Sequence, residues 1–368
     1  MQNPNFLRNE MTKSPEELEG LLELPTVRPA LLWEKVQDGK VRCGLCERRC
    51  EIREGSTGFC RTRVNISGRL YTMVYGDISS LSANPAEKKP FYHFYPGKLF
   101  LTAGTYGCTF RCPWCQNASI SQAYPNPREA NYISPEHFVR ISLEEGCVGT
   151  SLSFNEPTLL FEYALDLFPL AHEEGLLNTF VSNGYMTLEA LRMLRDAGLD
   201  AINIDVKGDA PAVRKYCAAE VEPVWRNVRE AKRLGMHVEV VNLVVPGVND
   251  REEQFRELAR RHLREAGDET PLHFTAYYPA YKFDAPPTPV ATLELARSVA
   301  VGEGLKFVYI GNVPGHRYEN TYCPTCGRLL VRRYGLELVE VDLEDRKCPG
   351  CGREIPIVGG GRTRGWAR

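Results

Sequence analysis

Three cysteines in one short run are the residues of this sequence best suited to redox chemistry. Cys108, Cys112 and Cys115 stand in the run GTYGCTFRCPWCQN, separated by three and then by two residues. Thiolates are the ligands that iron–sulfur clusters prefer. A 4Fe–4S cluster held by three thiolates keeps one iron without a protein ligand, and that iron is open to a small molecule. A zinc knuckle that lacks one ligand is the structural alternative.

The cysteine run resembles the signature of radical S-adenosylmethionine (SAM) enzymes, which also favour an aromatic residue at the position of Trp114. The resemblance implies that the amino and carboxylate groups of SAM bind the open iron. It further implies that one electron passed to the sulfonium releases methionine and a 5′-deoxyadenosyl radical.

Strand-like and helix-like runs alternate from about residue 98 to residue 311, which is typical of parallel βα units. The expected strands are 98–104, 150–155, 178–183, 200–206, 237–245, 271–276 and 305–311. The expected helices include 134–146, 157–175, 187–198 and 251–267. We therefore expect an α/β fold, a partial (β/α)6 TIM-like radical SAM barrel, with its site at the carboxyl ends of the strands.

Polar residues follow the second and third expected strands, where the resemblance implies SAM binding. Asn155 and Glu156 stand at the place of the family's GGE-type motif, whose backbone meets the SAM amino group, although its two glycines are absent here. Ser182 and Asn183 stand where the family holds the carboxylate and ribose of SAM. Taken singly, each of these residues could also be an ordinary polar strand end.

The next two strands carry further candidates. Asp205 and Lys207 end the fourth strand, and the alternation of side chains puts both on one face. They resemble the Asp-x-Lys motif of glycyl-radical activating enzymes, in which the pair reaches SAM. Asn242 and the run VVPGVND match the later strand that contacts the adenine side. No catalytic residue beyond these cofactor-binding candidates is assigned.

Four cysteines near the carboxyl end form two Cys-x2-Cys-Gly knuckles with 21 residues between them. Each knuckle turns backbone N–H groups toward its sulfurs, and its glycine accepts a positive φ. Two knuckles complete a tetrahedral four-thiolate site of the zinc-ribbon type. We expect structural zinc, with rubredoxin-type iron as the alternative. The ligands are Cys323, Cys326, Cys348 and Cys351.

Four cysteines near the amino end lie within 18 residues and predict another metal site. They form one knuckle and two less regular positions, without the compact run of bacterial ferredoxins. Zinc is the favoured metal, and an auxiliary iron–sulfur cluster is the alternative. This set is Cys43, Cys46, Cys50 and Cys60. The two remaining cysteines, Cys147 and Cys217, are expected to be buried, unreactive thiols.

The length of 368 residues accommodates one barrel and two small appendages, which we place at 1–97, 98–318 and 319–368. No apolar run approaches the ~18 residues that span a bilayer, and residues 1–20 do not resemble a signal peptide. The odd number of cysteines argues against a disulfide framework, so a cytoplasmic protein is expected. A formal net charge of −2 makes nucleic-acid binding unlikely on electrostatic grounds.

A finer resemblance covers roughly residues 30 to 357. The amino-terminal cysteine set, residues 76–97, and the runs CTFRCPWCQN, FNEPT, VSNG, DVKGD and YIGNVPGHRYENTYCPTCG follow in one order. This order resembles the AmmeMemoRadiSam-system radical SAM enzymes, which are related to pyruvate formate-lyase activating enzymes. It implies a Memo-like and an AMMECR-like partner protein. Candidates for substrate handling are Glu87, Lys88 and Lys89, with a charged surface loop as the alternative, and His273 in the sixth expected strand, with a core histidine as the alternative.

The expected function is a radical SAM enzyme that cleaves SAM reductively and abstracts hydrogen from a substrate over the barrel mouth. Its substrate, product and one-electron reductant are not identified by the sequence. Activation of a glycyl-radical partner protein is the first alternative, although no ferredoxin-type insert separates the cysteine triad from the barrel. A non-enzymatic zinc-ribbon interaction module is the second alternative, and it leaves Cys108, Cys112 and Cys115 without a use.

Overall fold

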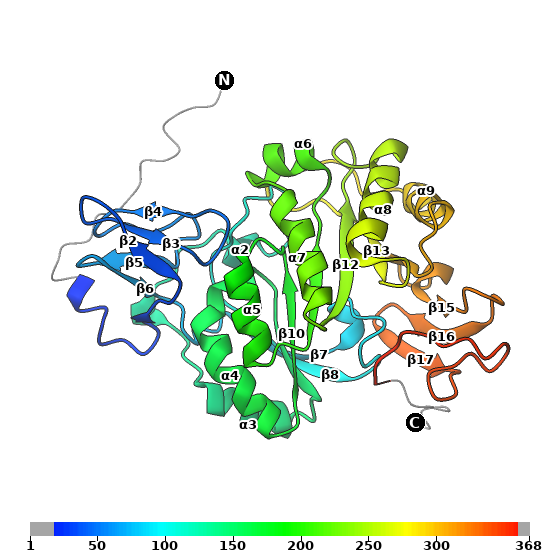
Figure 1. Cartoon of the computed structure of the whole chain (residues 1–368), viewed down its shortest axis with the longest axis horizontal. Coiled ribbons are helices and arrows are strands. Elements are labelled where there is room, and N and C mark those ends of the chain that lie inside the picture. Colours follow the sequence, from blue (N-terminus) through cyan, green and yellow to red (C-terminus); the bar gives the residue numbers. More distant parts are fainter. Residues whose placement is uncertain (1–17, 360–368) are drawn as a thin grey trace.

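An open eight-stranded sheet forms the centre of the protein in the computed structural model, which describes residues 18–359 (Figure 1). Residues 1–17 and 360–368, the outer parts of the two expected appendages, lie outside the described residues. The strand order is β14-β13-β12-β11-β10-β9-β8-β7. Strands β8 to β14 run parallel, and β7 (Ser80–Pro85) pairs antiparallel with β8 at one edge. The parallel strands are β8 (Leu99–Gly104), β9 (Gly149–Leu152), β10 (Leu177–Ser182), β11 (Ala201–Asp205), β12 (His237–Val244), β13 (Leu272–Ala276) and β14 (Val308–Gly311).

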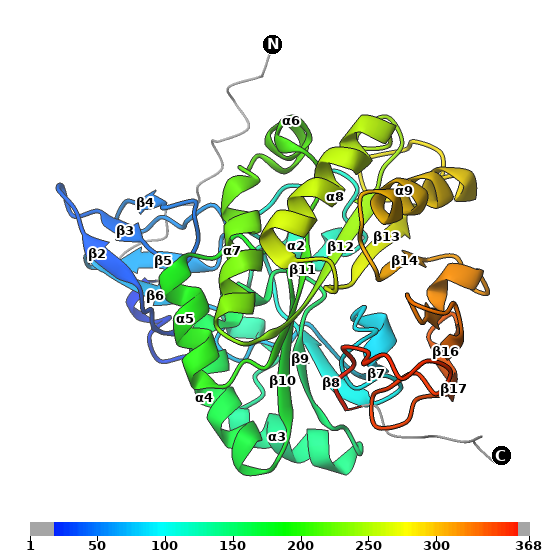
Figure 2. The same ribbon diagram turned by 45° about the vertical axis from the view of Figure 1, so that its right-hand side comes forward.

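Six helices connect successive parallel strands and cover one face of the sheet (Figure 2). They are α3 (Pro135–Glu144), α4 (Phe161–Glu173), α5 (Leu188–Ala197), α7 (Glu222–Arg233), α8 (Glu252–Ala266) and α9 (Val290–Gly302). The predicted α/β fold with parallel βα units is therefore confirmed, and every predicted strand has its counterpart. Edge strand β7 was not predicted. Within residues 18–359, no helix combines the length and apolar character needed to cross a bilayer.

Helix α5 shows why these segments become helices. Thr187 accepts a hydrogen bond from the Ala190 N–H group, a cap that contributes about 1 kcal/mol. One face of the helix is apolar and buries Leu191 and Leu194 against the sheet. The helix ends at Gly198, whose φ of 115° lies in the left-handed region that glycine tolerates.

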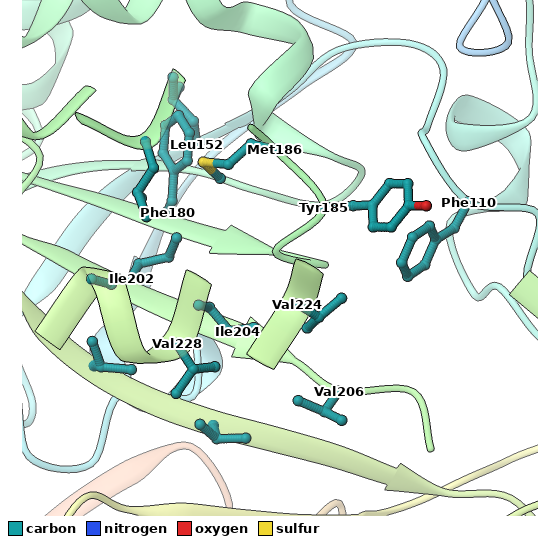
Figure 3. Close-up of a cluster of buried hydrophobic side chains, with 14 of the residues drawn as sticks. Phe110, Leu152, Phe180, Tyr185, Met186, Ile202, Ile204, Val206, Val224 and Val228 are labelled. Atoms are coloured by element: carbon teal, nitrogen blue, oxygen red, sulfur yellow. The ribbon is translucent and has the colours of Figure 1, made fainter. Parts of the chain in front are cut away.

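The core between the sheet and the helices reaches the cysteine run (Figure 3). Ile202 and Ile204 of β11 pack near Val228 of α7, and all three side chains are fully buried. At the edge of this core, the Phe110 ring meets the Tyr185 ring with centroids 5.3 Å apart in an edge-on arrangement. The core thus anchors one residue of the loop that carries the three cysteines.

The amino-terminal unit consists of two small antiparallel sheets beside the barrel (Figure 1, blue). Their orders are β1-β6-β5 and β2-β3-β4. The strands are β1 (Arg28–Pro29), β2 (Trp33–Lys35), β3 (Val41–Cys43), β4 (Glu51–Ile52), β5 (Arg63–Ile66) and β6 (Arg69–Thr72). Arg63 of β5 forms an ion pair with Glu162 of α4, and both side chains are buried. Glu162 also accepts a 2.8 Å hydrogen bond from the Leu31 N–H group, so one carboxylate joins the unit to the barrel.

The carboxyl-terminal ribbon lies at the other end of the sheet (Figure 1, orange to red). It contains the antiparallel strands β15 (Thr321–Tyr322), β16 (Leu329–Tyr334) and β17 (Glu337–Val341). Arg333 of β16 is buried, lies 3.5 Å from a Glu87 carboxylate oxygen and donates a 2.8 Å hydrogen bond to the Tyr92 carbonyl. The segment between β7 and β8 therefore connects the ribbon to the barrel, and the surface-loop alternative is wrong for Glu87 and Lys89, which are both buried.

We predict that Glu162→Ala lowers the free energy of unfolding by about 3–5 kcal/mol, because Arg63 then stays buried without its counter-charge. Urea unfolding followed by far-ultraviolet circular dichroism measures this change. The matched control is Glu144→Ala, which removes an exposed 3.9 Å pair with Arg140 and should leave the midpoint nearly unchanged. Equal effects of the two substitutions would contradict the prediction.

Candidate metal centres and the strand-end site

The three cysteines of the triad lie on one loop that leaves the carboxyl end of β8. Cys112 is buried, and Cys108 and Cys115 are half-buried. The Cys108 sulfur accepts a 3.3 Å hydrogen bond from the Phe110 N–H group and a 3.7 Å contact from the side-chain amide of Asn183. N–H groups that point at a sulfur stabilise its thiolate, the form that binds iron.

Two further contacts surround the triad. The Cys115 sulfur lies 3.1 Å from the Ser121 hydroxyl, in the short helix α2 (Ala118–Ser121). The Cys112 sulfur lies 3.4 Å from the sulfur of Cys217. The expectation that Cys217 is a buried thiol is confirmed, but its contact with a triad cysteine was not predicted.

Asn155 supports the loop from the neighbouring strand. Its side-chain oxygen accepts a 3.0 Å hydrogen bond from the Thr105 N–H group, and its amide group donates a 2.8 Å bond to the Gly107 carbonyl. Asn155 follows Phe154, which holds a positive φ of 67°. The Asn155 side chain therefore acts on the backbone that precedes Cys108.

Glu156 gathers the ends of two strands around a buried carboxylate. It accepts hydrogen bonds from the Ser182 hydroxyl at 2.8 Å, the Asn183 N–H group at 2.9 Å and the Thr158 N–H group at 3.1 Å. Burial raises the pKa of Glu156, and these donors oppose that rise. Asn183 in turn donates a 2.9 Å bond to the Thr109 hydroxyl. The structure thus brings Glu156, Ser182 and Asn183 together beside the triad loop.

Asp205, the last residue of β11, forms an ion pair with Lys207, so the two side chains lie on one side of the chain, whereas a pair between them was not predicted. Burial lowers the pKa of Lys207, but Asp205 and the thiol of Cys112 together raise it above its usual value. The second carboxylate oxygen of Asp205 is buried and has no hydrogen-bond partner among residues 18–359. Asn242, on β12, donates a 2.7 Å hydrogen bond to the Val206 carbonyl and so fixes the backbone between the pair.

The four carboxyl-terminal cysteines form a compact set. The sulfurs of Cys323 and Cys351 are 3.5 Å apart, those of Cys326 and Cys348 are 3.6 Å apart, and all four lie within 4.8 Å of one another. In each knuckle the glycine N–H group donates to the carbonyl of the first cysteine, at 2.9 Å from Gly327 and 2.8 Å from Gly352. These side chains could hold a metal ion.

The four amino-terminal cysteines, Cys43, Cys46, Cys50 and Cys60, line one pocket together with Arg63. Cys43 and Cys46 are buried, and Cys50 and Cys60 are half-buried. Their ligand atoms are not gathered as closely as the carboxyl-terminal set, which is the one such group of His, Cys, Asp or Glu found across the described part of the chain.

Sequence reasoning missed two arginines that bind this cysteine set to the triad loop. Arg48 donates hydrogen bonds of 2.8 and 2.7 Å to the Thr109 carbonyl and one of 3.2 Å to the Cys217 carbonyl. Arg111 donates a 3.0 Å bond to the Cys108 carbonyl and another to the Phe59 carbonyl. The sequence feature that could have identified them is the arginine between the cysteines of each run, in CERRC and in CTFRC.

Two candidates for substrate handling are buried. His273 lies in the amino half of β13, where it contacts the Glu239 carboxylate at 2.7 Å, and it agrees with the alternative of a core histidine. Lys89 is buried 5.1 Å from the centre of the Phe154 ring and forms no ion pair within the described range.

The triad fits an open iron–sulfur cluster by the chemistry of its donors. Three thiols share one loop, hydrogen-bond donors face the Cys108 sulfur, and a carboxylate oxygen of Asp205 without a partner lies near Cys112. Thiolates favour iron–sulfur clusters, and the carboxylate suits a ligand with a positive group. Burial, and more weakly the Glu156 carboxylate, raise the pKa of the Cys108 thiol, so ligation must release a proton.

Comparison with known proteins gives a match to one family model and similarities to individual proteins. The model of the Radical SAM superfamily matches residues 103–259. Uncharacterized protein MJ0808 of Methanocaldococcus jannaschii is 45% identical over 335 residues, which cover 90% of this chain and 100% of that protein. A GTP 3',8-cyclase of Nautilia profundicola is 29% identical over 150 residues, 39% of this chain and 46% of that enzyme. A solved domain of pyruvate-formate lyase-activating enzyme from Bacteroides vulgatus has 17% identity and a TM-score of 0.40, covering 45% of this chain and 99% of that domain.

Lys89 generates a prediction about pH. Burial, and more weakly Lys88, lower its pKa to about 7, whereas an exposed lysine titrates near 10.5. Between these values the unfolded chain binds one more proton, so raising the pH stabilises the folded protein. We expect Lys89→Met to be more stable than wild type at pH 6 and to lose this advantage by roughly 1.4 kcal/mol per pH unit above 7.

Urea unfolding of both proteins between pH 6 and pH 9 checks this expectation. Lys98→Met is the control, because Lys98 is an exposed lysine of the same segment. A stability difference between Lys89→Met and wild type that stays constant with pH would rule out titration of Lys89.

Proposed function

Because the chain belongs to the radical SAM superfamily, we propose that it binds a 4Fe–4S cluster through Cys108, Cys112 and Cys115 and cleaves SAM there. When bound, the cluster supplies one electron to the SAM sulfonium, which yields methionine and a 5′-deoxyadenosyl radical. The radical then abstracts a hydrogen atom from a substrate held over the carboxyl ends of the strands.

One observation carries this proposal: the polar strand ends converge on the triad loop. Glu156, with Ser182 and Asn183 bound to it, lies on one side, and Asn183 contacts the Cys108 sulfur. Asp205 and Lys207 lie near Cys112 on another strand. These are the side chains that would hold the polar atoms of a ligand if the open iron of a cluster bound one.

Each group has a distinct task. Lys207 offsets the carboxylate of SAM, and the free oxygen of Asp205 accepts from its amino group or faces its sulfonium. Glu156 holds the Ser182 hydroxyl and the Asn183 N–H group in place, and Asn242 holds the Val206 carbonyl. Asn155 fixes the start of the cysteine loop. These are binding and positioning roles, and the hydrogen-donating partner is the substrate itself.

A second candidate function is activation of a glycyl-radical partner protein. The observation that favours it is the Asp205–Lys207 pair, which occurs as an Asp-x-Lys motif in the activating enzymes that the sequence resembles. The same radical would then abstract hydrogen from a backbone glycine. A non-enzymatic interaction module is not favoured, since it leaves the triad and its hydrogen-bond network without a role.

The order of motifs supports a place in the AmmeMemoRadiSam system, with a Memo-like and an AMMECR-like protein as partners. A low-potential one-electron donor is a further partner that the chemistry requires. We place the activity in the cytoplasm, where cysteines stay reduced, because none of the 13 cysteines of the chain forms a disulfide.

We assign zinc to Cys323, Cys326, Cys348 and Cys351. Zinc–sulfur bonds of about 2.3 Å in a tetrahedron require sulfurs about 3.8 Å apart, and the measured separations of 3.5 and 3.6 Å are close to this value. The proposed layout is an amino-terminal extension (1–97), a radical SAM core (98–318) and a carboxyl-terminal zinc ribbon (319–368).

We predict that replacing Cys108, Cys112 and Cys115 by alanine removes the iron and sulfide of one cluster and abolishes SAM cleavage, because thiolate ligation is lost. Iron and sulfide analysis and detection of 5′-deoxyadenosine after anaerobic reconstitution measure both effects. Cys147→Ala is the control, since this buried thiol lies outside all three cysteine sets. Unchanged iron content in the triple variant would contradict the assignment of these three cysteines as cluster ligands.

We predict that Lys207→Ala weakens SAM binding by on the order of 1–3 kcal/mol, the contribution of a charge-assisted hydrogen bond. Equilibrium binding to the anaerobic, cluster-loaded protein measures the affinity, and cluster absorbance reports that the fold is intact. Lys215→Ala, at an exposed lysine, is the matched control. An affinity of Lys207→Ala within about twofold of wild type would remove Lys207 from the SAM site.

A further inference from the structure

The amino-terminal cysteines surround a pocket with a mixed lining. Besides the four cysteines, the lining contains the apolar side chains of Leu45, Ile52 and Leu159 and the cationic side chains of Arg48 and Arg63. No carboxylate or histidine is among the residues that line it. Soft thiolates in an apolar, cationic surrounding suit a metal–sulfur centre with net negative charge.

The two sets of four cysteines in this chain differ in the distances between their sulfur atoms. A single zinc ion draws four thiolates to about 3.8 Å of one another, and the carboxyl-terminal set has this geometry. The amino-terminal set does not, although both sets belong to the same described chain. A four-iron cluster holds its ligands farther apart, because each thiolate binds a different iron at a corner of the cube.

Donors already point at the amino-terminal sulfurs. The Phe59 N–H group donates to the Cys50 sulfur at 3.4 Å, and the Thr62 hydroxyl donates to the Cys60 sulfur at 3.2 Å. The Arg63 guanidinium reaches the Cys43 sulfur at 4.0 Å. Hydrogen bonds to sulfur are one of the levers by which proteins set the reduction potential of iron–sulfur clusters.

Two residues that line this pocket, Arg48 and Cys60, also contact the triad loop. The Cys60 carbonyl lies so near Gly107 that a Cβ at position 107 would be 2.4 Å from it. Arg48, between Cys46 and Cys50, donates hydrogen bonds to the Thr109 carbonyl. The guanidinium groups of Arg48 and Arg111 lie 3.8 and 4.0 Å from the centre of the Phe59 ring. Each cysteine run thus contacts the backbone of the other.

We propose that Cys43, Cys46, Cys50 and Cys60 bind a second 4Fe–4S cluster, not zinc, directly beside the triad. This proposal departs from the preference for zinc that the spacing alone suggested. All four irons have a thiolate ligand, so this cluster binds no SAM.

Its position suits one-electron transfer to the triad cluster. This role rests on the proposed SAM cleavage, but the presence of the second cluster is independent of that proposal. In this step the second cluster goes from its +1 to its +2 state, and the triad cluster goes from +2 to +1. A low-potential one-electron carrier protein then returns one electron to the second cluster.

Metal and sulfide analysis of the full-length chain, reconstituted anaerobically with iron and sulfide in the presence of zinc, tests the proposal. We expect about eight irons, eight sulfides and one zinc per chain, counting two cubes and one four-thiolate zinc site. About four irons and two zinc ions per chain would overturn the second cluster. Because wild type alone decides this outcome, the test does not depend on a variant that folds poorly.

The triple alanine variant of Cys108, Cys112 and Cys115 separates this proposal from the proposed function. It should keep about four irons and four sulfides and a reducible cluster signal in electron paramagnetic resonance. Loss of all iron in this variant would refute the second site. Failure of wild type to cleave SAM, with eight irons present, would refute the proposed function alone. In reduced wild type, magnetic interaction between neighbouring clusters should broaden both signals, and two independent, unbroadened signals would contradict their adjacency.

Discussion

The cysteine loop after β8 has little regular secondary structure, so its backbone must find partners outside itself. A buried N–H or carbonyl group without a partner costs free energy comparable to a lost hydrogen bond. Asn155 provides partners for Thr105 and Gly107, and Arg48 provides one for Thr109. The rest of the site depends on this constraint, because the same side chains that satisfy the loop also bring the strand ends and the amino-terminal unit against it.

The parts of this arrangement that depend on local spacing were predictable from sequence. Asp205 ends β11 and Lys207 follows it two residues later, and the alternation of side chains alone predicts that both lie on one face. The carboxyl-terminal knuckles likewise follow from Cys-x2-Cys-Gly turns. Strand β7 was missed because its sequence, SLSANP, contains Leu81 as its one large apolar residue and ends in proline. Its position depends on pairing with β8. Arg48 was missed because its partner Thr109 lies 61 residues away in the sequence.

The polar interior at the amino end of the sheet could not be predicted either. Glu239 is buried, yet it accepts hydrogen bonds from the Tyr92 and His93 N–H groups at 3.0 and 2.7 Å and contacts His273. Burial raises the pKa of Glu239, but His237 and His273 lower it well below its usual range. A lone glutamate in a strand of valines gives no sign of such partners. The structure shows that these contacts connect the segment between β7 and β8 to the sheet, at the opposite end from the triad.

The contact between Cys112 and Cys217 has a consequence for how the protein survives oxygen. Two thiols 3.4 Å apart need only a small movement to reach the disulfide bond length of about 2.05 Å. Before a cluster is inserted, oxidation would therefore compete with iron for the Cys112 sulfur. A disulfide at this place would deprive the cluster of one of its three ligands. A thiol reductant would reopen such a bond, so an inactivation of this kind would be reversible.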